Sequence, residues 1–203
     1  MSGNGDYFRS VAVLIVIVNV GGLLDLSFLD TLHVSALVYY VQGGEEGGHA
    51  LADLLSGQYN FSGKMATSWP YHFEDCPSSS NYSDASPDKY TQDYNEGIYV
   101  GYRYYDSFGV KPRFPFGFGL SYTTFDIAYK GFETCCCGKL CVSASISNTG
   151  DVSGKDVAQL YVSVPFADGN EAKRLVAFKK SSLLEASKAQ DVELCFTYKD
   201  LAV

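Results

Sequence analysis

Residues 11–18 read VAVLIVIV, an unbroken apolar run in which six of the eight residues are β-branched. A run of this kind without alternation is typical of a β-strand that is covered on both faces. A second apolar run, at 36–41, follows an amphipathic stretch at 23–32. Strand, crossover and strand in this order predict two parallel neighbours in one sheet.

The next segment predicts a helix that belongs to the same α/β unit. The sequence GGEEGG at 43–48 leads into HALADLLS at 49–56, and Gly57 stands where a helix C-cap is expected. Residues 71–97 are polar and without clear periodicity, which is typical of a long surface loop that carries function. Four apolar residues share one face of the predicted helix: Ala50, Leu51, Leu54 and Leu55.

Aromatic residues are concentrated between positions 98 and 125. Ten of the 27 residues from Tyr99 to Phe125 are Tyr or Phe, out of 30 aromatic residues in the chain. Ile98, Val100 and Tyr102 alternate with their neighbours, so we expect a strand that is buried on at least one face.

The remaining residues predict an all-β unit. Residues 140–147, 156–164 and 191–196 alternate between apolar and polar side chains, and NTGD at 148–151 is a turn signal. Short strands separated by turns describe a β-sandwich, which takes about 100 residues and seven strands. Only 77 residues follow position 126, so we expect a sandwich that is cut short.

Charge and composition exclude some classes of protein. The chain has 15 basic and 23 acidic residues, and its net charge of −8 argues against nucleic-acid binding. Residues 1–126 hold 14 acids and 6 bases, whereas 127–203 hold 9 of each, which suggests two units. No apolar run reaches the roughly 18 residues of a membrane helix, and residues 1–10 lack the positive charge of a secretory leader. We therefore expect no membrane association and a reducing, cytoplasmic location.

Several stretches, in a fixed order, resemble a known family. Residues 42–70 (QGGEEGGHALADLLSGQYNFSGKMATSWP), 96–106 (EGIYVGYRYYD) and 113–125 (RFPFGFGLSYTTF) look like the carboxy-terminal portion of glycoside hydrolase family 3, the β-glucosidase-like enzymes. Residues 145–165 and 173–196 are similar to the fibronectin type III-like domain that accompanies it. The resemblance covers nearly the whole chain.

The resemblance implies a retaining, cofactor-free enzyme that hydrolyses β-linked glucosides or related sugars. In this family the nucleophile lies in a segment resembling Ser-Asp-Trp on a (β/α)₈ barrel, and the acid/base glutamate of many members precedes the strand that 11–18 resembles. The only tryptophan here, Trp69, follows Ser68 without an aspartate, and residues 1–10 contain no glutamate. We therefore expect both catalytic carboxylates to lie outside this chain, and a (β/α)₈ barrel in the same or a neighbouring reading frame.

Two groups of charged residues contain the carboxylates that a sugar-hydrolysing or sugar-binding site needs. Glu45 and Glu46 could form a carboxylate pair, but acids at a helix start between flexible glycines favour a role at the helix terminus. The second group lies beside aromatic residues, and acids next to aromatic faces suit a sugar site. We favour a structural role for it, in which the aromatic side chains pack in the core and Arg103 forms an ion pair with Asp106. That group is Asp93, Glu96, Arg103 and Asp106.

The cysteines were weighed as a metal site. Zinc sites favour repeated C-x₂₋₄-C pairs, and the run at 135–141 supplies only one half of such a pattern, so incidental thiols are the favoured interpretation. We assign no catalytic residue, no metal ligand and no cofactor, and no individual substrate-binding residue can be named. The cysteines are Cys76, Cys135, Cys136, Cys137, Cys141 and Cys195.

These observations predict an α/β unit followed by an all-β unit. Residues 1–126 form a partial, parallel-sheet α/β sandwich of the glycoside hydrolase family 3 type, and 127–203 form a truncated fibronectin type III-like, immunoglobulin-like β-sandwich. The chain is expected to be the inactive part of a β-glucosidase or β-xylosidase. The alternative is a non-catalytic carbohydrate- or protein-binding module.

Overall fold

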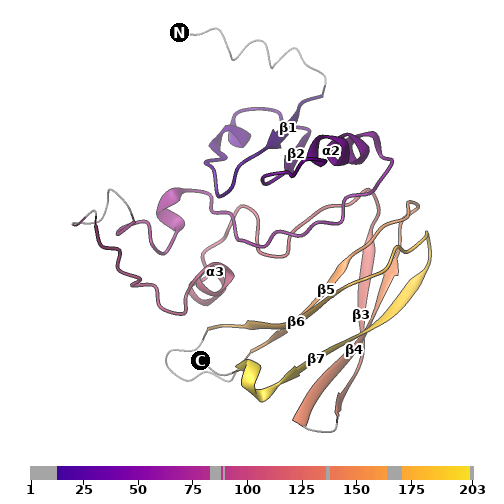
Figure 1. The fold of residues 1–203 in the computed structure, drawn as a ribbon. Coiled ribbons are helices and arrows are strands. Elements are labelled where there is room, and N and C mark those ends of the chain that lie inside the picture. Colours follow the sequence, from indigo (N-terminus) through magenta and orange to yellow (C-terminus); the bar gives the residue numbers. More distant parts are fainter. Residues whose placement is uncertain (1–12, 83–87, 89, 136–137, 164–170, 202–203) are drawn as a thin grey trace.

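The front of the chain forms a small parallel sheet, in the computed structural model drawn in Figure 1. Strand β1 (Ile15–Val18) pairs in parallel with β2 (Ala36–Tyr39), with Ile15 opposite Ala36. The parallel pair predicted from the apolar runs is therefore confirmed. The structure describes residues 13–82, 88, 90–135, 138–163 and 171–201.

Only one face of this sheet is covered, which corrects the expectation of a strand buried on both faces. Val18 is buried together with Leu26 and Trp69, whereas Ile15 and Ile17 are 45 and 40 % exposed. Within the described residues the sheet has two strands, and the layer on its covered face comes from the segments around Leu26 and Trp69.

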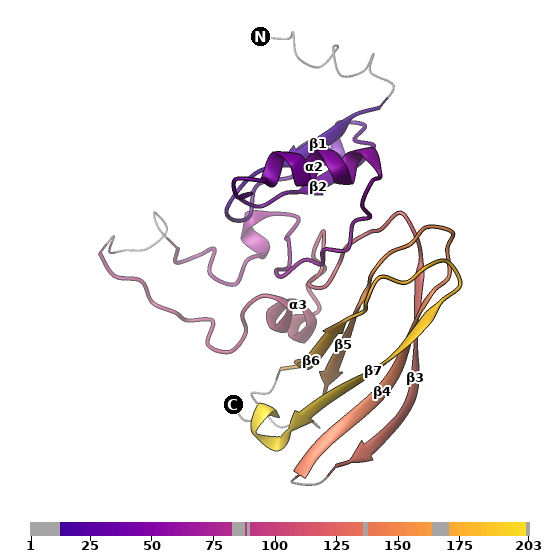
Figure 2. The same cartoon turned by 45° about the vertical axis from the view of Figure 1, so that its right-hand side comes forward.

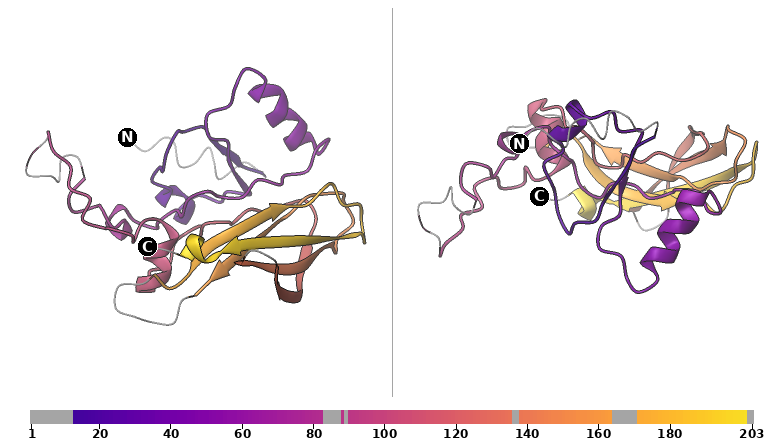
Figure 3. Two further views of the ribbon diagram at one scale, coloured as in Figure 1. Left: turned by 60° about the horizontal axis from the view of Figure 1, so that its bottom comes forward. Right: turned by 90° about the horizontal axis from the view of Figure 1, so that it is seen from above.

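Helix α2 (Gly47–Ser56) follows β2 in the front part; it overlaps β1 and β2 in the view of Figure 2 but stands apart from them in Figure 3. It ends at Gly57, whose φ of 80° is the left-handed conformation expected of a C-cap glycine. None of its residues is fully buried: on the predicted apolar face Leu51 and Leu54 are half-buried, whereas Ala50 and Leu55 are exposed. Where the amphipathic stretch 23–32 was expected to cross over, a short 3₁₀ turn spans Ser27–Asp30.

The glycine-rich loop before α2 closes around one tyrosine side chain. A Cβ added at Gly43 or at Gly47 would overlap the hydroxyl of Tyr40. With Tyr40 in this position, glycine at 43 and 47 allows the close packing of the loop.

Two extended segments, 63–69 and 114–119, run side by side beneath the small sheet. The Met65 N–H donates to the Phe118 carbonyl at 2.8 Å, and the Gly117 N–H donates to the Met65 carbonyl at 2.8 Å. Trp69 and Phe114 form an antiparallel bridge farther along. This pairing fixes Trp69, which belongs to the buried cluster of the front part.

The aromatic segment contains a helix where a strand was predicted. Helix α3 (Tyr102–Phe108) begins after Gly101 and ends at Gly109, which has a φ of 65°. Tyr105 is buried, and the Tyr102 ring lies 5.7 Å from the Tyr161 ring of the β unit. Apolar residues stand at so many positions here that both a two-residue and a helical period fit them, and the flanking glycines decide for the helix.

The β unit consists of two antiparallel sheets that enclose a common core. One sheet has the strand order β3-β4-β7, and the other pairs β5 with β6. Ala144 and Ile146 lie in the core, as the alternation predicted, together with Ala158, Val192 and Leu194. The strands are β3 (Phe125–Thr134), β4 (Lys139–Asn148), β5 (Val157–Val162), β6 (Arg174–Lys180) and β7 (Ala189–Thr197).

The front part lies against one side of the β unit (Figure 3). The Leu175 N–H donates to the Tyr102 hydroxyl at 2.8 Å, and Lys64 Nζ lies 2.8 Å from the Asp156 carboxylate. Lys180 Nζ donates to the Ser62 carbonyl at 2.9 Å. Among the described residues, no helix is both long and apolar enough to cross a membrane.

Candidate functional site

A pocket of about 340 Å³ opens on the front part, beyond the carboxyl end of β1. One wall is formed by residues 23–27, which follow β1, and the other by residues 70–74 with Cys76. Ligands of parallel α/β sheets bind beyond the carboxyl ends of the strands, so this is the position where a site is expected.

The two walls are held together by Trp69 and Leu26, which are each 2 % exposed. The indole Nε1–H of Trp69 donates to the Leu24 carbonyl at 2.7 Å, and the Tyr39 ring meets the Trp69 ring edge-on at 5.1 Å. The residues on both sides of the pocket are therefore anchored to the buried cluster of the front part.

The lining combines exposed apolar surface with acidic groups. Leu23, Leu24 and Phe73 are 46, 45 and 58 % exposed, and Asp25 and Glu74 supply carboxylates. Carboxylates accept hydrogen bonds from hydroxyl groups, while apolar side chains pack against the C–H surface of a ring. The pocket therefore offers apolar packing surface and hydrogen-bond acceptors side by side.

Cys76 lines the same pocket without being a nucleophile. Burial raises the pKa of its thiol, although the Tyr105 hydroxyl partly opposes the shift. At neutral pH the thiol is therefore protonated, and covalent catalysis through this sulfur is not supported.

An arginine–aspartate pair supports the wall that carries Tyr71. Arg113 donates from Nη1 and Nη2 to the two carboxylate oxygens of Asp30, at 2.8 and 2.7 Å. The guanidinium carbon of Arg113 lies 4.5 Å from the centre of the Tyr71 ring. The Arg113 hydrogen bonds hold the pKa of the Asp30 carboxyl below its ordinary value.

This pair makes thermal stability depend on pH. A carboxyl with a depressed folded-state pKa stabilises the protein above its ordinary value of 3.8, and this contribution is lost as the pH falls through the lower folded-state value. At pH 7 the melting temperature of wild type is therefore expected to be higher than that of Asp30→Asn. The difference between the two melting temperatures is expected to shrink below about pH 4. Thermal melts followed by Trp69 fluorescence measure this gap. Asp93→Asn controls for removing one exposed charge, and a gap of constant size down to pH 3 would contradict the assignment.

The glutamates weighed as a catalytic pair lie at the start of α2. Glu46 Oε2 is 2.7 Å from His49 Nδ1, and these side chains are 80 and 87 % exposed. Glu45 is exposed in the loop around Tyr40. Neither residue lines the pocket.

The second group of charged residues is not brought together at the pocket. Asp106 on α3 pairs with Lys173 of the β unit at 3.2 Å, and among the described residues this pair replaces the Arg103–Asp106 pair that was expected. The Asp93 main-chain carbonyl accepts a hydrogen bond from Asn81 Nδ2 at 2.7 Å, and Glu96 lies in the same polar loop.

Two cysteines that were expected to be incidental thiols are paired. Cys141 on β4 and Cys195 on β7 stand directly opposite each other, and they form a disulfide with their Cα atoms 4.1 Å apart. The strand register brings them together across 54 residues, which sequence spacing could not show. Cys136 and Cys137 lie outside the described residues.

The wall at 23–27, which carries Asp25, was not among the predicted site residues. The sequence did contain a signal for this wall. LLDL at 23–26 follows the first strand, and in α/β proteins the loop after a strand often presents a group to the ligand. The loop at 71–97 was predicted to be functional without named residues, and its first residues form the other wall.

Comparison with known proteins relates the chain to one family. Residues 9–102 match the model of the glycosyl hydrolase family 3 C-terminal domain. A β-glucosidase from Ruminococcus albus is 35 % identical over 191 residues, and β-glucosidase A from Butyrivibrio fibrisolvens is 37 % identical over 216 residues. These alignments cover 93 and 97 % of this chain, but 20 and 25 % of the two enzymes.

Solved structures show the same relationship. β-Glucosidase 3B from Thermotoga neapolitana, in complex with glucose, superposes with a TM-score of 0.83 at 37 % identity, over 93 % of this chain and 26 % of that one. A β-glucosidase from Paenibacillus barengoltzii gives 0.87 at 35 % identity, over 96 and 22 %. The chain thus spans a fifth to about a quarter of the length of these relatives.

Proposed function

Since the chain carries the C-terminal domain of glycosyl hydrolase family 3, we propose that it is the non-catalytic part of a β-glucosidase-type hydrolase. The whole enzyme would hydrolyse the O-glycosyl bond of β-linked glucosides or related sugars. One observation carries the proposal: nearly the whole chain aligns, in sequence and in structure, with one part of β-glucosidases.

The proposal places the reacting carboxylates outside this chain. Retaining hydrolysis needs two carboxyl groups about 5 to 5.5 Å apart, one as nucleophile and one as acid/base. The sequence lacks the segment that carries the family's nucleophile, and the Glu45–Glu46 pair stands exposed at the start of α2. A (β/α)₈ barrel, on the same or a separate chain, would supply the chemistry, and this chain would be inactive alone.

The pocket between 23–27 and 70–76 is the proposed contribution of this chain to sugar binding. The apolar side chains on both walls would pack on the face of a glucose-like ring, and Asp25 and Glu74 would accept hydrogen bonds from ring hydroxyls. The acidic lining suits a neutral sugar better than a phosphorylated one, because the carboxylates would repel a phosphate.

The exposed apolar surface of the front part supports a larger assembly. Ile15 and Ile17 on β1 and Leu55 on α2 are 38 to 45 % exposed. Apolar side chains on the open face of a sheet are stable when another layer covers them. We therefore propose that further residues of the enzyme complete the α/β sandwich of 1–126.

We also propose that residues 127–203 are a fibronectin type III-like domain. Two antiparallel sheets around one core agree with such a sandwich, although the described sheets have three and two strands. Strand β3 begins at Phe125, two residues before the proposed start of this domain at 127.

A domain-replacement experiment tests the proposed function. The corresponding part of the Paenibacillus barengoltzii β-glucosidase is replaced by this chain, and hydrolysis of an aryl β-glucoside is measured. The chimera is expected to turn over substrate, whereas the same enzyme with that part deleted is not. A folded chimera with no more activity than the deletion variant would contradict the proposal.

The lining of the pocket also favours a second candidate, a stand-alone carbohydrate-binding module. Apolar side chains beside two carboxylates could bind a sugar without any barrel. Titration with glucose, cellobiose or xylose under tryptophan and tyrosine fluorescence tests for sugar binding by the chain alone. Saturable binding that is lost in Phe73→Ala, together with an inactive domain-replacement chimera, would favour the module, whereas an active chimera would favour the enzyme part.

A further inference from the structure

Thiols and carboxylates gather on the outer face of the β3-β4-β7 sheet, away from the core. Because Ala144 and Ile146 of β4 point into the core, Cys141 lies on the opposite face. Cys195 on β7 stands directly opposite Cys141, and Glu133 on β3 stands opposite it on the other side. Three adjacent strands therefore bring these groups into one row.

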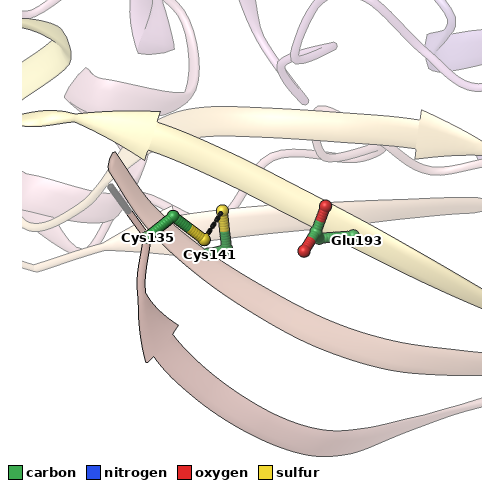
Figure 4. Close-up of side chains that lie close together, drawn as sticks. All are labelled: Cys135, Cys141 and Glu193. Atoms are coloured by element: carbon green, nitrogen blue, oxygen red, sulfur yellow. Dashed lines mark hydrogen bonds between the residues drawn. The ribbon is translucent and has the colours of Figure 1, made fainter. Parts of the chain in front are cut away.

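Two more groups complete the cluster. Cys135, at the end of β3, places its Sγ 3.3 Å from Cys141 Sγ and 3.9 Å from Glu133 Oε1. Glu193 lies two residues before Cys195 on β7, on the same face. The ligand atoms of Cys135, Cys141 and Glu193 lie within 4.8 Å of one another. Figure 4 shows the three side chains, with Cys135 Sγ directed at Cys141 Sγ.

We propose that the reduced form of this cluster binds one Zn²⁺ ion through Cys135, Cys141, Cys195 and Glu193. Three thiolates and one carboxylate are a four-coordinate donor set suited to zinc, and soft sulfur ligands disfavour Mg²⁺ and Ca²⁺. Half of the proposed ligands could not be found from the spacing of cysteines in the sequence. Cys135 and Cys141 belong to one hairpin, whereas Glu193 and Cys195 come from a strand about 50 residues later that the sheet register places beside it.

The disulfide and the zinc site exclude each other. A dithiol reductant donates two electrons and two protons to the Cys141–Cys195 disulfide; the S–S bond breaks, two thiols form, and the dithiol closes to a cyclic disulfide. Zn²⁺ then replaces the protons of three thiols, which pass to the buffer. In the disulfide form only Cys135 and Glu193 of the four ligands remain, too few for a closed zinc site.

Zinc titration of the full chain tests the proposal. The chain is reduced with dithiothreitol, desalted without oxygen and titrated with Zn²⁺ in a calorimeter, and then with Co²⁺ to record thiolate-to-cobalt absorption. One equivalent of saturable binding is expected for the reduced chain and none for the disulfide form. Cys195→Ser and Cys135→Ser are expected to lose it, while Cys76→Ser, which changes a cysteine away from the cluster, keeps it. Glu193→Gln is expected to weaken binding about tenfold, and Glu185→Gln, on an exposed residue before β7, is not.

A measurement on the wild-type chain tests the proposal even if the cysteine variants fail to fold. Zn²⁺ is expected to slow alkylation of Cys135 and Cys195, mapped by mass spectrometry, and to leave the rate at Cys76 unchanged. Unprotected Cys135 and Cys195 would overturn the proposal. So would zinc binding that survives Cys195→Ser but is lost when Cys136 and Cys137 are both changed to serine. A Cys135–Cys141 disulfide forming during reduction, with no zinc bound afterwards, would overturn it in favour of thiol exchange.

Discussion

Asn148→Leu is expected to lower the free energy of unfolding of the β unit by about 4 kcal/mol. The Asn148 side chain is 1 % exposed and uses both ends. Its Oδ1 accepts from Thr123 Oγ1 at 2.7 Å and from the Gly150 N–H at 3.2 Å. Its Nδ2 donates to the carbonyls of Val152 and Leu184, at 2.9 and 3.0 Å. Leucine keeps the branched shape of asparagine but is larger, so the loss combines buried polar groups left without partners with overpacking.

Urea unfolding followed by far-ultraviolet circular dichroism measures this loss. Asn95→Leu, at an exposed asparagine of the polar loop, is the matched control and is expected to change stability by less than about 0.5 kcal/mol. Equal stabilities for the two variants would show that the Asn148 hydrogen bonds do not hold the turn at 148–151.

Gly119→Ala is expected to cost about 3 kcal/mol, through steric overlap of two backbone segments. A Cβ at position 119 would overlap the Gly63 carbonyl oxygen, and a main-chain atom cannot move aside as a side-chain tip can. The overlap would push apart the paired segments 63–69 and 114–119, which position Trp69 and the pocket walls.

Gly63→Ala is the matched control for this substitution. It lies across the same pair of segments, but a Cβ there meets no atom within 4 Å, so its stability is expected to stay within about 0.5 kcal/mol of wild type. Trp69 fluorescence during thermal unfolding reports on this region directly. A melting temperature for Gly119→Ala that equals the value for Gly63→Ala would contradict the predicted overlap.

Elements set by local patterns could be predicted from the sequence. The parallel β1–β2 pair followed from two β-branched runs, α2 from apolar spacing and its glycine cap, and β4 from strict alternation. In each case the residues that determine the element lie within it or next to it. The family followed from several motifs in order, which the alignments confirm.

Features that depend on tertiary contacts could not be predicted. The segment around Tyr102 fits two periods; its flanking glycines favoured a helix already in the sequence, whereas its packing against Tyr161 is seen only in the structure. The exposed face of β1 could not be foreseen, because an apolar run does not say how many layers cover it. The Cys141–Cys195 pair depends on the register of strands that are distant in sequence.

Of the two walls of the candidate pocket, one could be predicted from the sequence and the other could not. The loop that begins at 71 was predicted to be functional from its length and polarity. Its partner wall at 23–27 became evident only once Trp69 was seen to hold Leu24 beside it. The sequence motifs that resemble the family lie mostly outside the pocket, in segments that pack the front part against the β unit.

Hydrolysis of aryl β-glucoside and aryl β-xyloside by the purified chain tests whether the chain lacks both reacting carboxylates. Folded protein is expected to show no turnover above a no-protein control, because the reacting carboxylates are proposed to lie on a barrel domain. Glu46→Gln and the double variant Asp25→Asn with Glu74→Gln are assayed alongside it. Clear turnover by the wild-type chain that disappears in either variant would contradict the account and place a complete active site within this chain.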